Sequence, residues 1–137
     1  MPTEDQIKQK YMEFKVLQEH IQKINEHMEV LKNQTAEIGL TKDALRDFTT
    51  MKVGSEILVP LADGIFIKGE LKNNKDLLVN VGADTVVERS VPDVIKLIEE
   101  QQSQVQNRLL EAQVLLEEFE SQAMKIYEEV ESNVREA

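Results

Sequence analysis

The stretch that decides the fold is residues 14–38, FKVLQEHIQKINEHMEVLKNQTAEI. Apolar side chains recur in it at alternating intervals of three and four residues, and only Thr35 breaks the series. This narrow apolar stripe is typical of a coiled-coil seam. Extended outward, the seven-residue repeat predicts one helix over residues 4–48, in which Gly39 costs about 1 kcal/mol relative to Ala. The predicted seam positions are Ile7, Lys10, Phe14, Leu17, Ile21, Ile24, Met28, Leu31, Thr35, Ile38, Lys42 and Leu45.

A second seven-residue repeat covers residues 92–136. This helix is expected to start around Ser90, because Pro92 and Asp93 are residues favoured in a first helical turn. Its predicted seam positions are Ile95, Ile98, Gln102, Val105, Leu109, Ala112, Leu116, Phe119, Ala123, Ile126, Val130 and Asn133. The two helices have nearly equal lengths, which favours pairing with each other.

An antiparallel register fits both seams. In such a pair, facing seam residues have numbers with a constant sum, and a sum of 140 places every a position opposite a d position. It pairs Phe14 with Ile126, Ile24 with Leu116 and Leu31 with Leu109. The alternative, a globular helical bundle, would need a wider apolar face on each helix.

The middle segment, residues 53–90, changes to an alternation every two residues and predicts two β-hairpins. The first joins strands 56–60 and 65–71 through Asp63-Gly64, a strong hairpin-turn signal. The second joins strands 76–81 and 85–89 through Gly82-Ala83-Asp84. The predicted fold class is therefore mainly α with a small β part: a long antiparallel coiled-coil hairpin with two β-hairpins between the helices, in a single domain spanning residues 1–137.

The strands predict partner chains. Ile57-Leu58-Val59 and Ile65-Phe66-Ile67 are apolar on both faces, and isolated hairpins are marginally stable in water. We expect other subunits, identical or related, to cover them. The predicted oligomerisation residues are Ile57, Val59, Ile65, Phe66, Ile67, Leu77 and Val79.

Composition narrows the function. The 137 residues include no Cys, which excludes disulfides and thiol chemistry. A net charge of −10 argues against nucleic acid, and no apolar run is long enough to cross a membrane. The N-terminus is acidic and polar, unlike a signal peptide, so we expect a cytoplasmic protein. His20 and His27 lie about 10 Å apart on one helix, too far for one metal ion. The sequence shows no catalytic constellation, so no enzyme, metal or cofactor is expected.

The ends of the two helices carry apolar residues outside the seam. Such residues are often only scattered surface side chains. The alternative interpretation is an adhesive tip, since Met side chains adapt to varied apolar partners and helix ends fray. The leading candidates are Tyr11, Met12, Tyr127 and Val134.

The middle segment resembles the prefoldin α family. The resemblance rests on Gly54-Ser55-Glu56-Ile57-Leu58-Val59-Pro60-Leu61 and Gly64-Ile65-Phe66-Ile67-Lys68-Gly69-Glu70-Leu71, continued by Leu78-Val79-Asn80-Val81-Gly82 and Val87-Glu88-Arg89-Ser90. The order helix, two hairpins, helix extends it over the whole chain, and two hairpins indicate the α rather than the β class. After Gly82, the chain has Ala83-Asp84-Thr85-Val86, where the family has small and aromatic residues.

The resemblance implies an ATP-independent holdase. Its hexamer would contain two α-class and four β-class subunits, with a β base and arms whose tips clasp unfolded polypeptides and pass them to a group II chaperonin. One rival is a structural or tethering coiled coil that oligomerises through its hairpins without binding clients. Another is a transcript-cleavage-type factor, but there acidic residues occupy the helical turn where this chain has strands.

Overall fold

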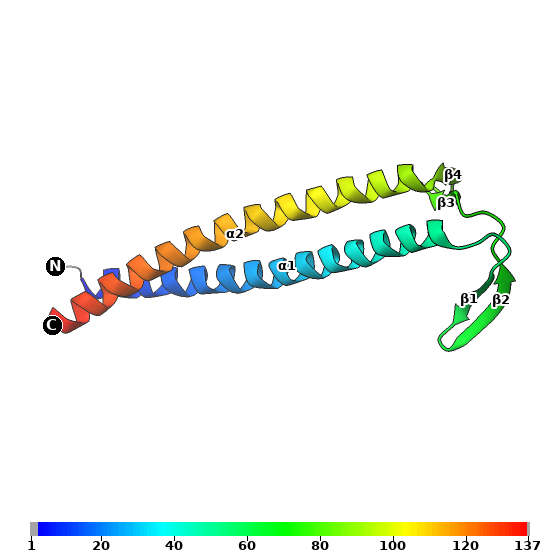
Figure 1. The fold of residues 1–137 in the computed structure, drawn as a ribbon. Coiled ribbons are helices and arrows are strands. Elements are labelled where there is room, and N and C mark those ends of the chain that lie inside the picture. The colour runs from blue at the N-terminus through cyan, green and yellow to red at the C-terminus, as the bar shows by residue number, and fades with distance from the viewer. Residues whose placement is uncertain (1–2, 137) are drawn as a thin grey trace. The chain divides into compact units, whose positions relative to one another are not determined.

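The computed structural model describes the backbone of residues 3–136 and the side chains of residues 3–132. Two long helices, α1 (Glu4–Thr50) and α2 (Val91–Glu136), flank four short strands in the sequence (Figure 1). The strands are β1 (Glu56–Ala62), β2 (Ile65–Glu70), β3 (Asp76–Asn80) and β4 (Val86–Ser90). The predicted fold class, two long helices with two antiparallel hairpins between them, is confirmed.

Both helices begin at side-chain caps. The backbone N–H of Thr3 donates to Oε1 of Gln6 at 2.9 Å, and the N–H of Gln6 donates to Oγ1 of Thr3 at 3.3 Å, which is a capping box. At α2, the N–H of Asp93 donates to the Ser90 hydroxyl at 3.3 Å. The first helix ends two residues beyond the prediction, where the hydroxyls of Thr49 and Thr50 donate to carbonyls one turn back.

The chain divides into two compact units, and each is described by itself. The arm unit comprises residues 1–35 and 104–137. Within it, the side chains of Leu31, Val105, Ala112 and Ala123 are buried, and every other described seam side chain is half-buried. The small Ala112 and Ala123 are thus covered, as expected for positions that face long side chains.

Contacts within the arm unit define an antiparallel register. Lys10 forms an ion pair with Glu129, and the rings of His20 and Phe119 lie 5.6 Å apart. The residue numbers of both pairs add up to 139. Phe14 and Tyr127, with ring centroids 6.1 Å apart, add up to 141. These sums bracket the predicted 140, so the observed contacts agree with the predicted register to within one residue.

The hairpin unit, residues 36–103, contains two separate two-stranded antiparallel sheets, β1–β2 and β3–β4. The first turn needs Gly64, whose φ of 77° is unfavourable for other residues. β1 extends past Pro60 to Ala62, with a register shift between these two residues. Pro60 has no N–H to donate, and β1 has only β2 as a described neighbour, so Pro60 fits at its free edge.

A small core in the hairpin unit joins strands to helix ends. Leu71, Val91 and Val94 are buried there. The backbone of Leu71 exchanges hydrogen bonds with Gly54 and Ser55 at 2.7 and 2.9 Å, and the N–H of Val91 donates to the Lys75 carbonyl at 2.9 Å. These three residues belong to no clear repeat, and the sequence did not single them out as core.

Candidate functional site

The predicted tip residues are exposed while the neighbouring seam is covered. The exposed fractions are 63% for Tyr11, 67% for Met12 and 53% for Tyr127. The Val134 side chain lies outside the described side chains. Tyr127 contacts the seam through the Phe14 ring, and the exposed surface of all three side chains is free for contact with another chain.

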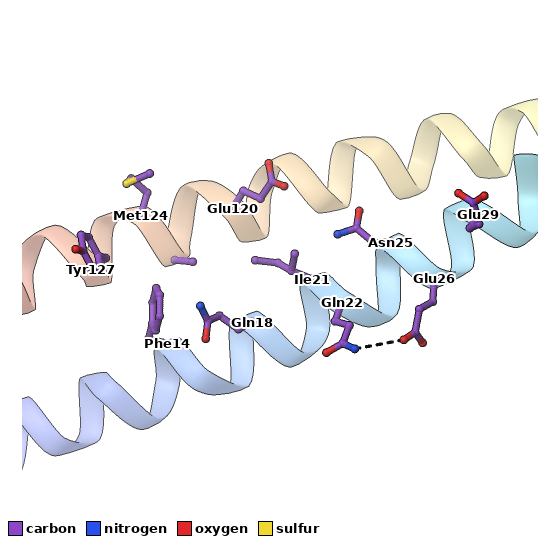
Figure 2. Close-up of a pocket in the computed structure, with 11 residues that line it drawn as sticks. Phe14, Gln18, Ile21, Gln22, Asn25, Glu26, Glu29, Glu120, Met124 and Tyr127 are labelled. Carbon is purple, nitrogen blue, oxygen red and sulfur yellow. Dashed lines mark hydrogen bonds between the residues drawn. The ribbon is translucent and has the colours of Figure 1, made fainter.

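The Tyr127 groove runs along one side of the arm unit and has a volume of about 890 Å³ (Figure 2). Its apolar lining consists of Phe14, Ile21, Ala123, Met124 and Tyr127. Ala123 is the shortest side chain of this lining, and the tilted rings of Phe14 and Tyr127 form one end of the groove.

Polar side chains complete the lining of the Tyr127 groove. They are Gln18, Gln22, Asn25, Glu26, Glu29 and Glu120. One hydrogen bond links two of them, from Nε2 of Gln22 to Oε1 of Glu26 at 3.5 Å. All three charged groups in this lining are carboxylates.

The Met12 groove, of about 630 Å³, lies on the other side of the seam. Its lining residues are Gln9, Met12, Glu13, Val16, Leu17, His20, Phe119, Gln122 and Ile126. Heptad geometry places the two grooves on opposite flanks, since Gln18 and Tyr127 occupy e positions and His20 and Gln122 occupy g positions. The imidazole of His20 is exposed and lies beside the Phe119 ring.

The structure does not bring the predicted tip residues into one cluster. Tyr127 lines one groove, Met12 lines the other, and Tyr11 lines neither. Sequence reasoning also missed that the seam residues Phe14 and Phe119 contribute to groove walls. The sequence signal that could have predicted these groove walls was the pattern of short and long side chains next to the seam.

The predicted oligomerisation residues lie on the two hairpins. Val59, Ile65, Phe66 and Ile67 are exposed, whereas Ile57, Leu77 and Val79 are half-buried. The Ile57 side chain lies over Gly69, its cross-strand partner, which accounts for its lower exposure. Val59 pairs with Ile67 and Pro60 with Phe66 across the first hairpin, so apolar residues remain uncovered on both of its faces.

The described residues contain neither a cluster of metal-ligating side chains nor a membrane-spanning helix. None of their His, Asp and Glu side chains gather in a group of three that would hold a metal ion. No helix in the described part of the chain is long and apolar enough to cross a membrane.

The fold defines a class of coiled-coil proteins in which two long helices enclose a pair of small β-hairpins. A family model described as "Prefoldin subunit" matches residues 17–136. The chain belongs to the prefoldin family, in its alpha class, and is thereby one subunit of an oligomeric chaperone.

Relatives and a solved structure agree with this assignment. Prefoldin subunit alpha of Archaeoglobus fulgidus is 26% identical over 130 residues, covering 95% of both chains. Prefoldin subunit alpha of Pyrococcus horikoshii is 29% identical over 109 residues, covering 79% of this chain and 74% of the relative. A chain in the cryo-EM structure of filamentous PFD from Methanocaldococcus jannaschii has the same fold, with a TM-score of 0.64, 18% identity and coverage of 90% of this chain and 97% of that one.

Proposed function

We propose that this chain is a subunit of an ATP-independent holdase, which captures unfolded polypeptides at the free ends of its helices and prevents their aggregation. The observation that carries the proposal is the exposure of Tyr11, Met12 and Tyr127 beside a covered seam. Aromatic and Met side chains offer large apolar contact areas that adapt to different partners. Val134 belongs to the proposed contact surface by its position in the sequence.

Each tip contact is expected to be weak. Full burial of one such side chain contributes only about 1.5–3 kcal/mol. Several arms that hold one client together would raise the affinity through effective concentration. Separate weak contacts also account for release without ATP, because each arm can let go independently.

The hairpins are the proposed assembly surface. The exposed Ile65, Phe66 and Ile67 would be buried against other subunits, as part of a hexamer with two α-class and four β-class chains. A homomeric assembly, in which copies of this chain cover the exposed hairpin residues, is the second candidate. In either assembly, the proposed complex works in the cytoplasm and hands clients to a group II chaperonin.

Light scattering of a refolding model protein tests the holdase activity. The assembled wild-type complex should suppress the scattering, and a variant with Tyr11, Met12, Tyr127 and Val134 all replaced by Ser should suppress it much less. A matched control replaces Leu110 and Val114 by Ser, since these apolar residues of the arm unit are equally exposed but lie further along α2 from Tyr127.

This experiment separates the holdase from the tethering alternative. If the protein is a tether, the wild-type complex should assemble but should not reduce the light scattering of the refolding client. If the four-residue variant protects clients as well as the wild type does, the client-binding surface is elsewhere on the chain. β-class arms contribute their own contacts, so matching tip variants of those subunits belong in the same series.

A further inference from the structure

Two grooves on opposite sides of the arm unit differ in charge. The Tyr127 groove has three charged lining residues, Glu26, Glu29 and Glu120, all of them acidic. On the other side, a smaller groove next along the helices is lined by Lys23, His27, Arg108 and Glu111 among others. The charged lining of the Tyr127 groove is therefore more negative than that of this smaller groove.

The three carboxylates of the Tyr127 groove are not paired with cations among the described side chains. The Gln22 amide donates the only hydrogen bond that a described side chain makes to any of them. The nearest cations along α1 are Lys23, three residues from Glu26, and Lys32, three residues from Glu29, and neither is part of the lining. The negative potential of these three carboxylates therefore acts on any ligand that occupies the groove.

Apolar and acidic groups are only partly separated along this groove, because Glu120 lies between its two ends. Figure 2 shows Phe14, Met124 and Tyr127 at one end and Glu26 and Glu29 at the other. Phe14 and Glu26 are 12 residues apart on one helix, which corresponds to about 18 Å. An extended peptide covers this distance with about five or six residues. The groove thus matches a short extended segment rather than a single side chain.

We propose that the Tyr127 groove binds extended client segments that combine a large apolar or aromatic residue with a Lys or Arg. The two residues lie about five positions apart in the client, in either order. The apolar anchor contacts Phe14, Met124 and Tyr127, the cation lies near the carboxylates of Glu26 and Glu29, and Glu120 lies between these two ends. This inference rests on the proposed client binding and specifies the class of segment that is preferred.

The preference is expected to be moderate and dependent on salt. Exposed ion pairs contribute little individually, so two or three of them correspond to about a 5- to 10-fold preference for basic over neutral flanks at low ionic strength. At about 1 M salt, the screening length falls to about 3 Å and the preference should largely disappear. Binding through the apolar anchor should persist at that salt concentration.

Fluorescence anisotropy with three labelled peptides of equal length tests this inference on the assembled full chain. All three contain one Phe anchor, and about five residues from it they contain two Lys, two Ser or two Glu. The expected order of affinity is Lys over Ser over Glu. In E26Q/E29Q/E120Q the Lys peptide should bind only as tightly as the Ser peptide, whose own affinity should stay unchanged.

A matched control, E13Q/E111Q/E118Q, removes three carboxylates of the same unit that lie outside the Tyr127 groove. It should keep the preference for the Lys peptide. Equal loss in both triple variants would assign the preference to overall charge and overturn the inference, as would equal affinities of the three peptides for the wild type. If no peptide binds and refolding clients still aggregate, the proposed function itself fails.

Discussion

The arm unit and the hairpin unit use their apolar residues in opposite ways. In the arm unit, the apolar seam of α1 is covered by that of α2, and side chains such as Leu31 and Val105 are buried within this one chain. In the hairpin unit, Leu58, Ile65 and Phe66 stay exposed, because a two-stranded sheet has too few residues to cover both of its faces.

This difference separates two sources of stability. The seam is stabilised by contacts within the chain, so its stability should depend little on protein concentration. The hairpins lack such contacts, and their apolar surface can leave water only against another chain. The comparison predicts that substitutions on the hairpins mainly affect assembly, whereas substitutions in the seam mainly affect the free energy of unfolding.

The largest effect is expected from two charges on the first hairpin. Ile65→Asp with Ile67→Asp places two carboxylates on one face of β2, where the proposed interface excludes water. We expect complete loss of the oligomer, measured by sedimentation velocity, while the helix content in circular dichroism is retained. Thr41→Asp with Ala44→Asp adds the same charge at exposed helix positions and should still assemble. Normal assembly of the β2 variant would place the interface elsewhere.

A smaller effect is expected from the seam. Leu31 is only 2% exposed, so Leu31→Ala should lower the free energy of unfolding by about 2–5 kcal/mol, through lost burial and the cavity that remains. Leu110→Ala removes the same atoms from a side chain that is 61% exposed and should cost less than about 1 kcal/mol. Thermal unfolding at one fixed protein concentration compares the two. Similar losses would mean that the seam is no better covered than the outer surface of α2.

The seam was predictable from sequence because its physical requirement is periodic. A side chain is covered in a two-helix coil only if it recurs every 3.5 residues, so the repeat from Phe14 to Ile38 fixes which face of α1 is buried. The hairpin turn at Asp63-Gly64 was predictable for a similar local reason, because few residues other than Gly adopt the φ that it needs.

Features that depend on the surroundings of single residues were not predictable in this way. Leu71 and Val91 are buried by connecting segments that have no repeat. The grooves combine seam residues with side chains beside the seam, so exposure of Tyr127 was expected whereas its grouping with Phe14 was not. By contrast, Leu110 and Val114 are exposed because they occupy b and f positions of the α2 repeat, which face away from the seam.

Replacing a glycine by Ala should change the free energy of unfolding by about 1 kcal/mol, with opposite signs in the helix and in the turn. Gly39 lies inside α1, and a Cβ added there would meet no atom within 4 Å. Gly39→Ala should therefore stabilise the chain by about 1 kcal/mol. Gly64→Ala also meets open space but has to adopt the positive φ of the β1–β2 turn, so it should destabilise by a similar amount or more. Chemical denaturation curves measure both, and a loss of stability in Gly39→Ala would indicate that the helix needs its glycine.

The smallest expected effect concerns a polar interruption of the seam in the hairpin unit. Lys42 occupies a seam position, and its Nζ lies 3.1 Å from Oε1 of Glu99, whose side chain is half exposed. Because of this exposure, Glu99→Gln should cost only about 0.2–1 kcal/mol, and the cost should vanish at about 1 M salt. Lys42→Met removes the charge but places an apolar side chain in the seam, so we expect no loss, or a small gain, in the free energy of unfolding.

A double-mutant cycle isolates the Lys42–Glu99 interaction, since the cost of Glu99→Gln should disappear once Lys42 is Met. The same cycle on Lys10 and Glu129 provides the matched comparison in the arm unit. Both pairs are partly exposed, so their coupling energies should be similarly small. The single replacements by Met should differ, because the Lys42 side chain is 19% exposed and that of Lys10 is 35% exposed. Met therefore gains more burial at position 42. If Lys42→Met and Lys10→Met change the free energy of unfolding equally, the seam covers position 42 no better than position 10. The two units would then not differ in how well they cover these seam positions.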